Sequence, residues 1–381
     1  MRFKTAKTVI DRFIETKEEN GAAAVITRHG IPVFSYSAGY ANVEEKQPFT
    51  EDTICRIYSA TKVATSMACM MLMERGLLDI GERLEVYLPE FEKPFCIREG
   101  RKIPSQSIRI RDLLNMTSGI PYPGDGMDEA IAMSNDLWGR LDQSIRDGNS
   151  RATRGFAKSA AKNPLVFPAG ERWMYGASAD VLGAVIEEIS GMEFADFLQK
   201  EIFDPLEMTE TAFYVPEEKR DRLGVLYDSA GENPTRPDYV NLCIYDFEER
   251  PAFQSGGAGL FSTAKDYAKL GAELSSGRKG LLSRRTVDFM RQNGLTASQR
   301  VSYDWESVLG YGYANLCRIV EDNNLAGSLA GKGAFGWDGW TGPYVLIDPD
   351  EEMSITLFIQ RANSGTTRLS RSLVNAVYGE L

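Results

Sequence analysis

Strand-like segments lie in pairs at both ends of this 381-residue chain, and this placement restricts the possible folds more than any other feature of the sequence. Within each pair, a short turn joins two runs of strand-forming residues, which is typical of a hairpin. Each pair has a helical segment beside it. The predicted strands cover residues 22–28, 31–38, 343–348 and 353–360, and the two helices cover 5–19 and 367–379. We expect both ends to complete one antiparallel sheet flanked by these helices.

The long middle part of the chain is predicted to be mostly helical, with loops rich in Gly, Pro and Asn between its segments. The helices are expected over residues 63–76, 109–116, 127–147, 179–190, 193–203, 264–275 and 284–292. A chain of this length has room for more than one core. The sequence therefore predicts an α/β (α+β) fold, in which residues 1–80 and 301–381 form a sheet domain and residues 81–300 form an inserted, mostly helical domain.

The chain contains a single histidine, His29. A Ser-His-Asp triad, a histidine-rich metal site or a histidine base would each depend on that one residue. His29 is predicted at the tip of the first hairpin, where nothing buries or orients an imidazole. We therefore expect no catalytic role for His29, and neither a metal nor a cofactor.

The net charge of −11 argues against a nucleic-acid partner and against an anionic membrane surface, because both require a basic face. The longest nearly apolar run, residues 63–73, is too short to span a bilayer. The charged N-terminal segment lacks the apolar stretch of a signal peptide. Five scattered cysteines without a C-x-x-C pair are typical of reduced, buried thiols. These features predict a cytoplasmic protein without a membrane span.

Short motifs need their context before they indicate a function. The run Gly331–Gly336 matches the dinucleotide pattern G-x-G-x-x-G, but a strand follows it instead of a helix, so we exclude nucleotide binding. The motif S-x-x-K occurs four times, beginning at Ser59, Ser159, Ser262 and Ser276. We expect Ser159 in a solvated run over 146–162, Ser262 next to a helix cap and Ser276 at a helix end.

Ser59 differs from the other three because it opens an apolar segment typical of a buried helix. Lys62 then lies one turn further along, on the same face. Burial disfavours an ammonium ion, so such a lysine is suited to accept the serine proton, and the first N–H groups of the helix are suited to stabilise an oxyanion. The alternative is a plain helix cap at Ser59, with Lys62 reaching solvent.

The sequence around Ser59 resembles the serine β-lactamase and penicillin-binding-protein superfamily, and most of all the class C β-lactamase-like group that includes the family VIII carboxylesterases. The resemblance follows the chain in order through Tyr58-Ser59-Ala60-Thr61-Lys62, Met73 to Asp79, Tyr87 to Phe91, Ile110 to Gly119, Phe167 to Gly170, Trp173 to Tyr175, Asp180 to Gly183, Gly256 to Leu260 and Gly336 to Gly339. It implies an active site in the cleft between the sheet and the helical domain.

The resemblance also implies roles for individual residues. Ser59 is the acylated nucleophile, Lys62 is its proton-relay partner, and Tyr175 is the second base. The backbone N–H groups of Ser59 and Trp340 form the oxyanion hole. For Tyr175 the residues alone favour a core tyrosine before a helix. Tyr122, which follows the Thr-Ser-Gly segment, either reaches the site or stiffens its rim, and the sequence does not decide between the two.

The chain departs from the class C pattern at two motifs. Ala177 replaces the asparagine of Tyr-x-Asn, and Trp337, Asp338 and Gly339 replace Lys-Thr-Gly. Losing that lysine weakens the attraction for anionic β-lactams and peptides. The aromatic residues Trp337, Trp340 and Tyr344 either line an apolar acyl pocket or belong to the core. Asp338 either meets a substrate amine or is a solvated turn residue.

These features together predict a serine hydrolase that forms an acyl-enzyme on small neutral esters, with Trp337, Asp338, Gly339 and Tyr122 contacting a small-molecule ester or amide. A β-lactamase or a D-amino-acid amidase is the alternative within the family. A non-catalytic ligand-binding or sensor domain on the same fold is the alternative from another class. The missing asparagine and lysine motivate that last reading.

Overall fold

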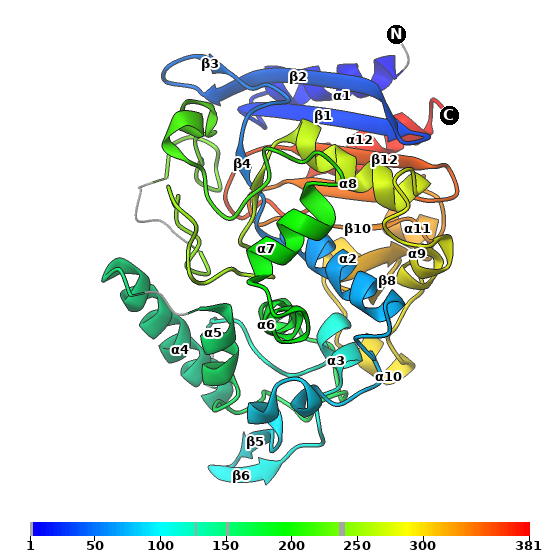
Figure 1. Ribbon diagram of the computed structural model, residues 1–381. Coiled ribbons are helices and arrows are strands. Elements are labelled where there is room, and N and C mark those ends of the chain that lie inside the picture. Colours follow the sequence, from blue (N-terminus) through cyan, green and yellow to red (C-terminus); the bar gives the residue numbers. More distant parts are fainter. Residues whose placement is uncertain (1–2, 126–127, 150–151, 236–240) are drawn as a thin grey trace.

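The computed structural model describes residues 3–125, 128–149, 152–235 and 241–381. Its main feature is an eight-stranded antiparallel sheet with the strand order β3-β2-β1-β12-β11-β10-β9-β8 (Figure 1). The N-terminal strand β1 pairs with the C-terminal strand β12, with Ala23 opposite Phe358 and Arg28 opposite Met353. The prediction that both chain ends complete one antiparallel sheet is therefore confirmed.

The strands of this sheet are β1 (Gly21–Arg28), β2 (Ile31–Asn42), β3 (Gln47–Pro48), β8 (Tyr311–Ala314), β9 (Cys317–Val320), β10 (Phe335–Asp338), β11 (Tyr344–Asp348) and β12 (Met353–Phe358). Two small ladders join β4 (Cys55–Arg56) to β7 (Phe261–Ser262) and β5 (Phe95–Arg98) to β6 (Arg101–Pro104). The helices are α1 (Lys4–Glu15), α2 (Thr61–Glu74), α3 (Ile110–Leu114), α4 (Glu129–Arg146), α5 (Thr153–Ala160), α6 (Ser178–Ser190), α7 (Phe194–Leu198), α8 (Ala264–Ser276), α9 (Arg284–Met290), α10 (Ala297–Arg300), α11 (Asn323–Ala326) and α12 (Arg368–Tyr378).

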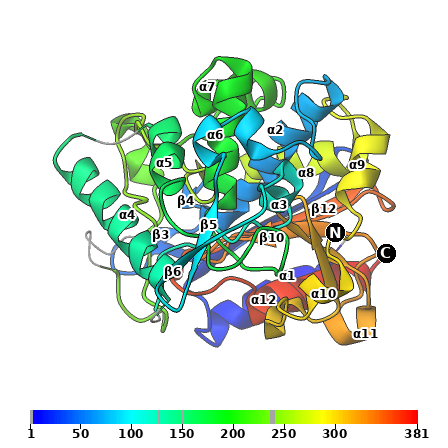
Figure 2. The ribbon, with the colours of Figure 1, turned by 90° about the horizontal axis from the view of Figure 1, so that it is seen from below.

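The sheet lies between two layers of helices (Figure 2). Helices α1 and α12 pack against each other on one face, because both carry an apolar stripe at helical spacing. In α1 that stripe is Ala6, Ile10 and Phe13, all buried. Helix α8 packs on the other face against β1, β11 and β12. Helix α2 lies on the same side of the sheet as α8 (Figure 2). Its first twelve residues are buried, as its composition predicts.

The first hairpin carries the only histidine. His29 and Gly30 form its two-residue turn with φ values of 52° and 74°, the left-handed conformations that such a turn requires. The imidazole Nδ1 lies 2.8 Å from Glu352 Oε2, and 66% of the side chain is exposed. The predicted position of His29 at an exposed turn is therefore confirmed.

The other S-x-x-K motifs have structural explanations. Thr263, next to Ser262, caps α8 by accepting the Asp266 N–H at 3.0 Å, and Gly277 ends the same helix in the left-handed region directly after Ser276. The prediction of a solvated run over 146–162 is right only in part, because residues 146–149, Lys158 and Lys162 are exposed, whereas residues 153–160 form helix α5 with one buried face. Its Phe156 face is buried and packs against α6, an amphipathic pattern hidden among basic residues.

The other predicted helices and strands are present within a few residues of their expected ends. The hairpin β5–β6 and the strands β8 and β9 were not expected, and residue 127 of the predicted helix 127–147 lies outside the described residues. The division of the chain into residues 1–80 with 301–381 and residues 81–300 stays a prediction. Within the range 81–300, helix α8 packs on the sheet.

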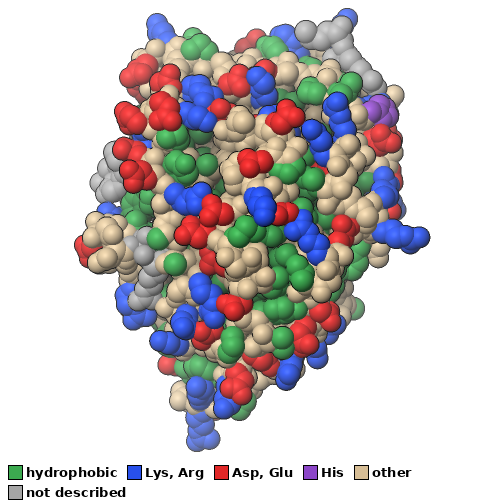
Figure 3. All heavy atoms as spheres, viewed as in Figure 1, with side chains coloured by type: hydrophobic (Ala, Val, Ile, Leu, Met, Phe, Trp, Pro, Cys, Tyr) green, Lys and Arg blue, Asp and Glu red, His purple; other side chains and the backbone are tan. Residues whose placement is uncertain are grey.

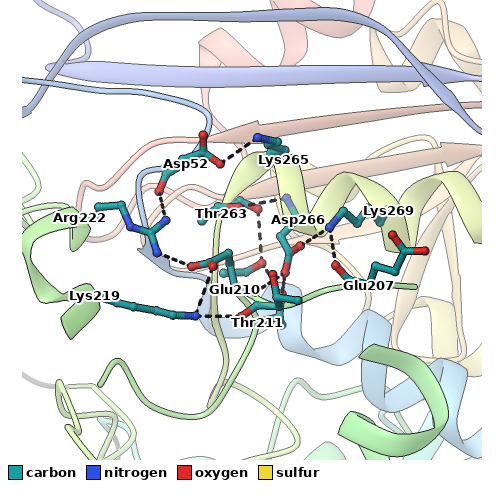
Figure 4. Close-up of polar contacts among 12 residues, drawn as sticks. Asp52, Glu207, Glu210, Thr211, Lys219, Arg222, Thr263, Lys265, Asp266 and Lys269 are labelled. Carbon is teal, nitrogen blue, oxygen red and sulfur yellow. Dashed lines mark hydrogen bonds and ion pairs between the residues drawn. The ribbon is translucent and has the colours of Figure 1, made fainter. Parts of the chain in front are cut away.

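A polar network holds the start of α8 against the segment 207–222 (Figure 4). The buried Asp266 carboxylate accepts from Thr211 Oγ1 at 2.8 Å and from the Glu210 N–H at 2.9 Å, and it pairs with Lys269 at 2.7 Å. Glu210 in turn pairs with Arg222 at 2.5 Å. Because Asp266 is almost fully enclosed, these partners are needed to compensate its charge, and they fix the position of the helix.

Charged side chains of both signs are interspersed over the face shown in Figure 3, with no extended basic patch on it. Within the described parts of the chain, no helix is long and apolar enough to cross a membrane. All five cysteines are buried and unpaired, as predicted.

Candidate active site

Ser59 lies in a single turn of 3-10 helix, Tyr58–Ala60, which leads directly into α2. Strand β4, which pairs with β7, leads directly into this turn. Tyr58 adopts a φ of 40°, a strained conformation for a residue with a side chain. The Tyr267 hydroxyl of α8 donates to the Ala60 carbonyl at 2.6 Å. The nucleophile candidate therefore stands on a rigid turn that the sheet and α8 hold from two sides.

Lys62 is completely buried one turn after Ser59. Its Nζ lies 3.3 Å from Ser59 Oγ, 3.3 Å from the Tyr122 hydroxyl and 2.7 Å from the Gly257 carbonyl oxygen. Burial lowers the pKa of Lys62 to about 7, against the attraction of the Asp180 and Asp338 carboxylates. A lysine in this state accepts a proton near neutral pH. The alternative of a helix cap with Lys62 reaching solvent is wrong.

Tyr175 reaches the same group from the loop before α6. Lys62 Nζ lies 4.6 Å from the centre of the Tyr175 ring, and the indole N–H of Trp337 donates to the Tyr175 hydroxyl at 3.1 Å. Burial raises the pKa of Tyr175, while its interactions with Ser59 and Trp337 favour the phenolate. The structure thus brings Ser59, Lys62 and Tyr175 together, as the resemblance implies.

Tyr122 belongs to the site and not only to its rim. Its hydroxyl donates to Asp180 Oδ2 at 3.1 Å and lies against Lys62. Asp180 is fully buried in α6 and also accepts the Ser255 hydroxyl and the Gly257 N–H. Burial raises the pKa of this carboxyl.

Sequence reasoning gave no role to Asp180, Ser255 or Gly257. The available signal was a single acidic residue in the otherwise apolar run 179–186, since a charge in a buried helix face needs partners. Asp180 supplies a counter-charge for Lys62 and holds the Tyr122 hydroxyl, so it acts as a positioning group behind the lysine.

The segment after β10 lies beside the Ser59 turn. A side chain at Gly339 would meet the Ile57 carbonyl, so glycine permits this close approach. The Trp340 ring packs edge-on against Tyr58 at 5.0 Å. The oxyanion hole of Ser59 and Trp340 N–H groups stays a prediction that this proximity supports.

The resemblance places Trp337 and Asp338 where class C enzymes are expected to have a lysine and a threonine. The Trp337 ring is almost fully buried and stacks on Tyr175 at 5.6 Å. Asp338 pairs with the buried Arg318 at 2.7 Å and accepts the Thr366 hydroxyl. Arg318 compensates the charge of Asp338. Asp338 is therefore not an isolated carboxylate that would pair with a substrate amine.

Among the residues that the structure describes, no group of three or more His, Cys, Asp or Glu side chains is arranged to hold a metal ion. The chemistry available at the site is that of a serine hydroxyl, a buried amine and two phenols.

The sequence matches the model of the family described as "Beta-lactamase" over residues 6–379, which is nearly the whole chain. The chain belongs to the Beta-lactamase family. Its fold of a large antiparallel sheet with helices on both sides is also that of solved relatives. The chain is 26% identical to EstCE1, described as a hydrolase with promiscuous acyltransferase activity, with a TM-score of 0.82 over 99% of this chain and 98% of that one.

Two of the curated relatives are named as esterases. Esterase EstB from Burkholderia gladioli is 28% identical over 97% of this chain and 93% of its own length. Lovastatin esterase from Penicillium rubens is 29% identical over 94% of this chain and 90% of its own length. These matches confirm the resemblance that the motifs around Ser59 indicate.

Proposed function

We propose that this protein is a serine carboxylesterase that hydrolyses small neutral esters through an acyl-enzyme on Ser59. The observation that carries the proposal is the buried Lys62 amine, 3.3 Å from the Ser59 hydroxyl and 3.3 Å from the Tyr122 hydroxyl. A serine becomes nucleophilic when a neighbouring base takes its proton, and this arrangement supplies such a base without histidine. The names of the relatives agree with the expectation of ester hydrolysis.

In the acylation step, Ser59 Oγ attacks the ester carbonyl carbon while its proton passes to Lys62, with Tyr175 as the second proton carrier. The carbonyl oxygen gains the negative charge and faces the backbone N–H groups of Ser59 and Trp340. The bond from the carbonyl carbon to the alcohol oxygen then breaks. The departing oxygen takes the proton from the Tyr175 and Lys62 pair, and the alcohol leaves.

In the deacylation step, a water molecule attacks the acyl carbon and gives one proton to the same pair. The bond to Ser59 Oγ breaks, and Oγ recovers that proton. A carboxylic acid is released and the enzyme returns to its starting state, so the protons balance over the cycle.

A neutral ester fits the site better than an anionic substrate. Trp337 replaces the lysine that would attract a substrate carboxylate. The nearby charge of Arg318 is neutralised by Asp338. Attraction for a substrate carboxylate is therefore weak. The same ion pair disfavours the amidase alternative, since a substrate amine would have to compete with the Arg318 guanidinium for Asp338.

The experiment that tests this function is intact-mass spectrometry after treatment with a fluorophosphonate probe, followed by turnover of short acyl esters, nitrocefin and D-amino acid amides. We expect one adduct per chain, located on Ser59, and turnover of the esters. A chain that forms no adduct and turns over no substrate would be a binding or sensor domain, and preferred turnover of nitrocefin or the amides would overturn ester preference.

The dependence of kcat/KM on pH is a further prediction. Because the basic form of Lys62 is the active one, activity should rise with pH around an apparent pKa of about 7, shared with the residues coupled to it. His29 is the only imidazole in the chain, so His29→Ala is the control. This variant should keep the whole rise of kcat/KM with pH (the limb of the profile), since His29 contacts Glu352 and not the site. Loss of the limb in His29→Ala would contradict the assignment.

We also propose a cytoplasmic location. The five buried, unpaired cysteines support a reducing compartment, and fractionation of cells that produce the protein at native levels is the corresponding measurement.

A further inference from the structure

An exposed indole lies directly beside the proton-carrying tyrosine. Trp305 sits between α10 and β8, just before the short 3-10 turn Glu306–Val308. Its ring packs edge-on at 5.4 Å from the Tyr175 ring and at 5.0 Å from the Trp173 ring. Yet 43% of Trp305 is exposed, whereas Trp173 and Trp337, which also contact Tyr175, are 3% exposed. A partly exposed indole therefore lies against the ring of Tyr175.

The loop that carries Trp305 is fixed to the segment that carries Tyr175. The Trp173 N–H donates to Ser302 Oγ at 2.9 Å, and the Tyr303 ring packs against the Trp173 ring at 4.8 Å. Trp305 is thus held in one place relative to Tyr175 and forms part of a prepared surface.

The chemistry decides which part of an ester meets this surface. During acylation the departing alcohol oxygen takes its proton from the Tyr175 and Lys62 pair, so this oxygen must come within hydrogen-bond reach of them. The carbon atoms of the alcohol continue from that oxygen, which meets Tyr175, and the exposed indole that packs against the Tyr175 ring is Trp305. The other partly exposed indole, Trp340, packs against Tyr58 on the Ser59 side of the site.

We propose that Trp305 forms the wall of the alcohol subsite and selects esters whose alcohol part is bulky and apolar. This inference rests on the proposed function. An apolar group placed against the indole removes both surfaces from water, and an aromatic ring adds an edge-to-face contact. A short alcohol such as ethanol does not extend far enough to gain either.

The test compares 2-naphthyl butyrate with ethyl butyrate, which share one acyl group. We expect Trp305→Ala to lower kcat/KM for the naphthyl ester about tenfold and for the ethyl ester less than about twofold. The deacylation rate of the butyryl-enzyme should not change, because the alcohol has left by then. Trp305→Phe should recover most of the loss. Leu309→Ala, which changes a half-exposed apolar residue of the same loop, is the matched control and should resemble the unchanged protein.

An equal loss for the two esters, no loss for either, or slower deacylation would overturn the proposed subsite. These outcomes require that the unchanged protein hydrolyses both esters. If it hydrolyses neither, the proposed function itself fails, and with it the subsite. The two failures are therefore distinguished by the unchanged protein alone.

Discussion

Replacing Ser59 by alanine is expected to lower kcat/KM for p-nitrophenyl butyrate by about 10⁴-fold or more. The substitution removes the atom that attacks the carbonyl, so no acyl-enzyme forms and only positioning by the rest of the site remains. The measurement is steady-state hydrolysis by the purified variant, together with intact-mass spectrometry after the fluorophosphonate probe. The variant should show no covalent adduct.

Ser262→Ala is a suitable control for Ser59→Ala. Ser262 also begins an S-x-x-K motif and is fully buried, but its hydroxyl pairs with Thr211 at 2.8 Å, away from Lys62. We expect its activity to follow the amount of folded protein. Unchanged ester turnover in Ser59→Ala would show that the assignment of the nucleophile is wrong.

Replacing Lys62 by methionine is expected to lower the rate of acylation by p-nitrophenyl butyrate by about 10³-fold. Methionine has nearly the length of lysine and fits an apolar surrounding, but it cannot accept the Ser59 proton. The pre-steady-state release of p-nitrophenol measures this step directly. The residual rate should also lack the rise with pH around pH 7. If its pH profile is unchanged, that rise belongs to a group other than Lys62.

The stability of the same variant, relative to that of the unchanged protein, should increase as the pH falls. Folding lowers the pKa of Lys62 to about 7, whereas an exposed lysine in the unfolded chain titrates near 10.4. Between these values the unfolded state binds more protons, so the stability of the unchanged protein rises with pH. The cost of a buried ammonium ion is full below pH 7 and absent in Lys62→Met.

Thermal unfolding as a function of pH measures this difference. The Tm of Lys62→Met should exceed that of the unchanged protein most at pH 6, and the gap should close as the pH approaches 10. A gap that does not depend on pH would show that Lys62 keeps its proton in the folded state. Titrating groups that are not coupled to Lys62 are common to both proteins and cancel in the comparison.

The sheet and its flanking helices could be predicted from the sequence because their patterns are local. Two strand-like runs joined by the short turn at His29-Gly30 reveal β1 and β2, and the stripe that includes Ile10 and Phe13 reveals α1. The strands β8 and β9 escaped prediction because buried aromatic and charged residues interrupt their pattern. In β9, Arg318 is buried through its pair with Asp338, a contact that only the assembled sheet creates.

The nucleophile and its lysine could also be predicted, because three residues of separation on a helix fix their geometry. The other members of the site come from distant parts of the chain. Tyr122 and Asp180 meet Lys62 across separate loops and helices. The lone acidic residue in the apolar run 179–186 indicates that Asp180 needs a partner, but no local pattern identifies which residue that partner is. The ion pair that neutralises Asp338 likewise has no signal in the sequence. Asp338 could therefore be interpreted either as a partner of a substrate amine or as a solvated turn residue.

The pairing of β1 with β12 has a consequence for how the protein is made. Residues 21–28 leave the ribosome early. They cannot pair with β12 until residues 353–358 have been synthesised, some 330 residues later. At translation rates of about 5–20 residues per second, the first hairpin waits tens of seconds with one edge unpaired. During that interval it is open to aggregation. Molecular chaperones that shield nascent hairpins should therefore raise the yield of folded protein.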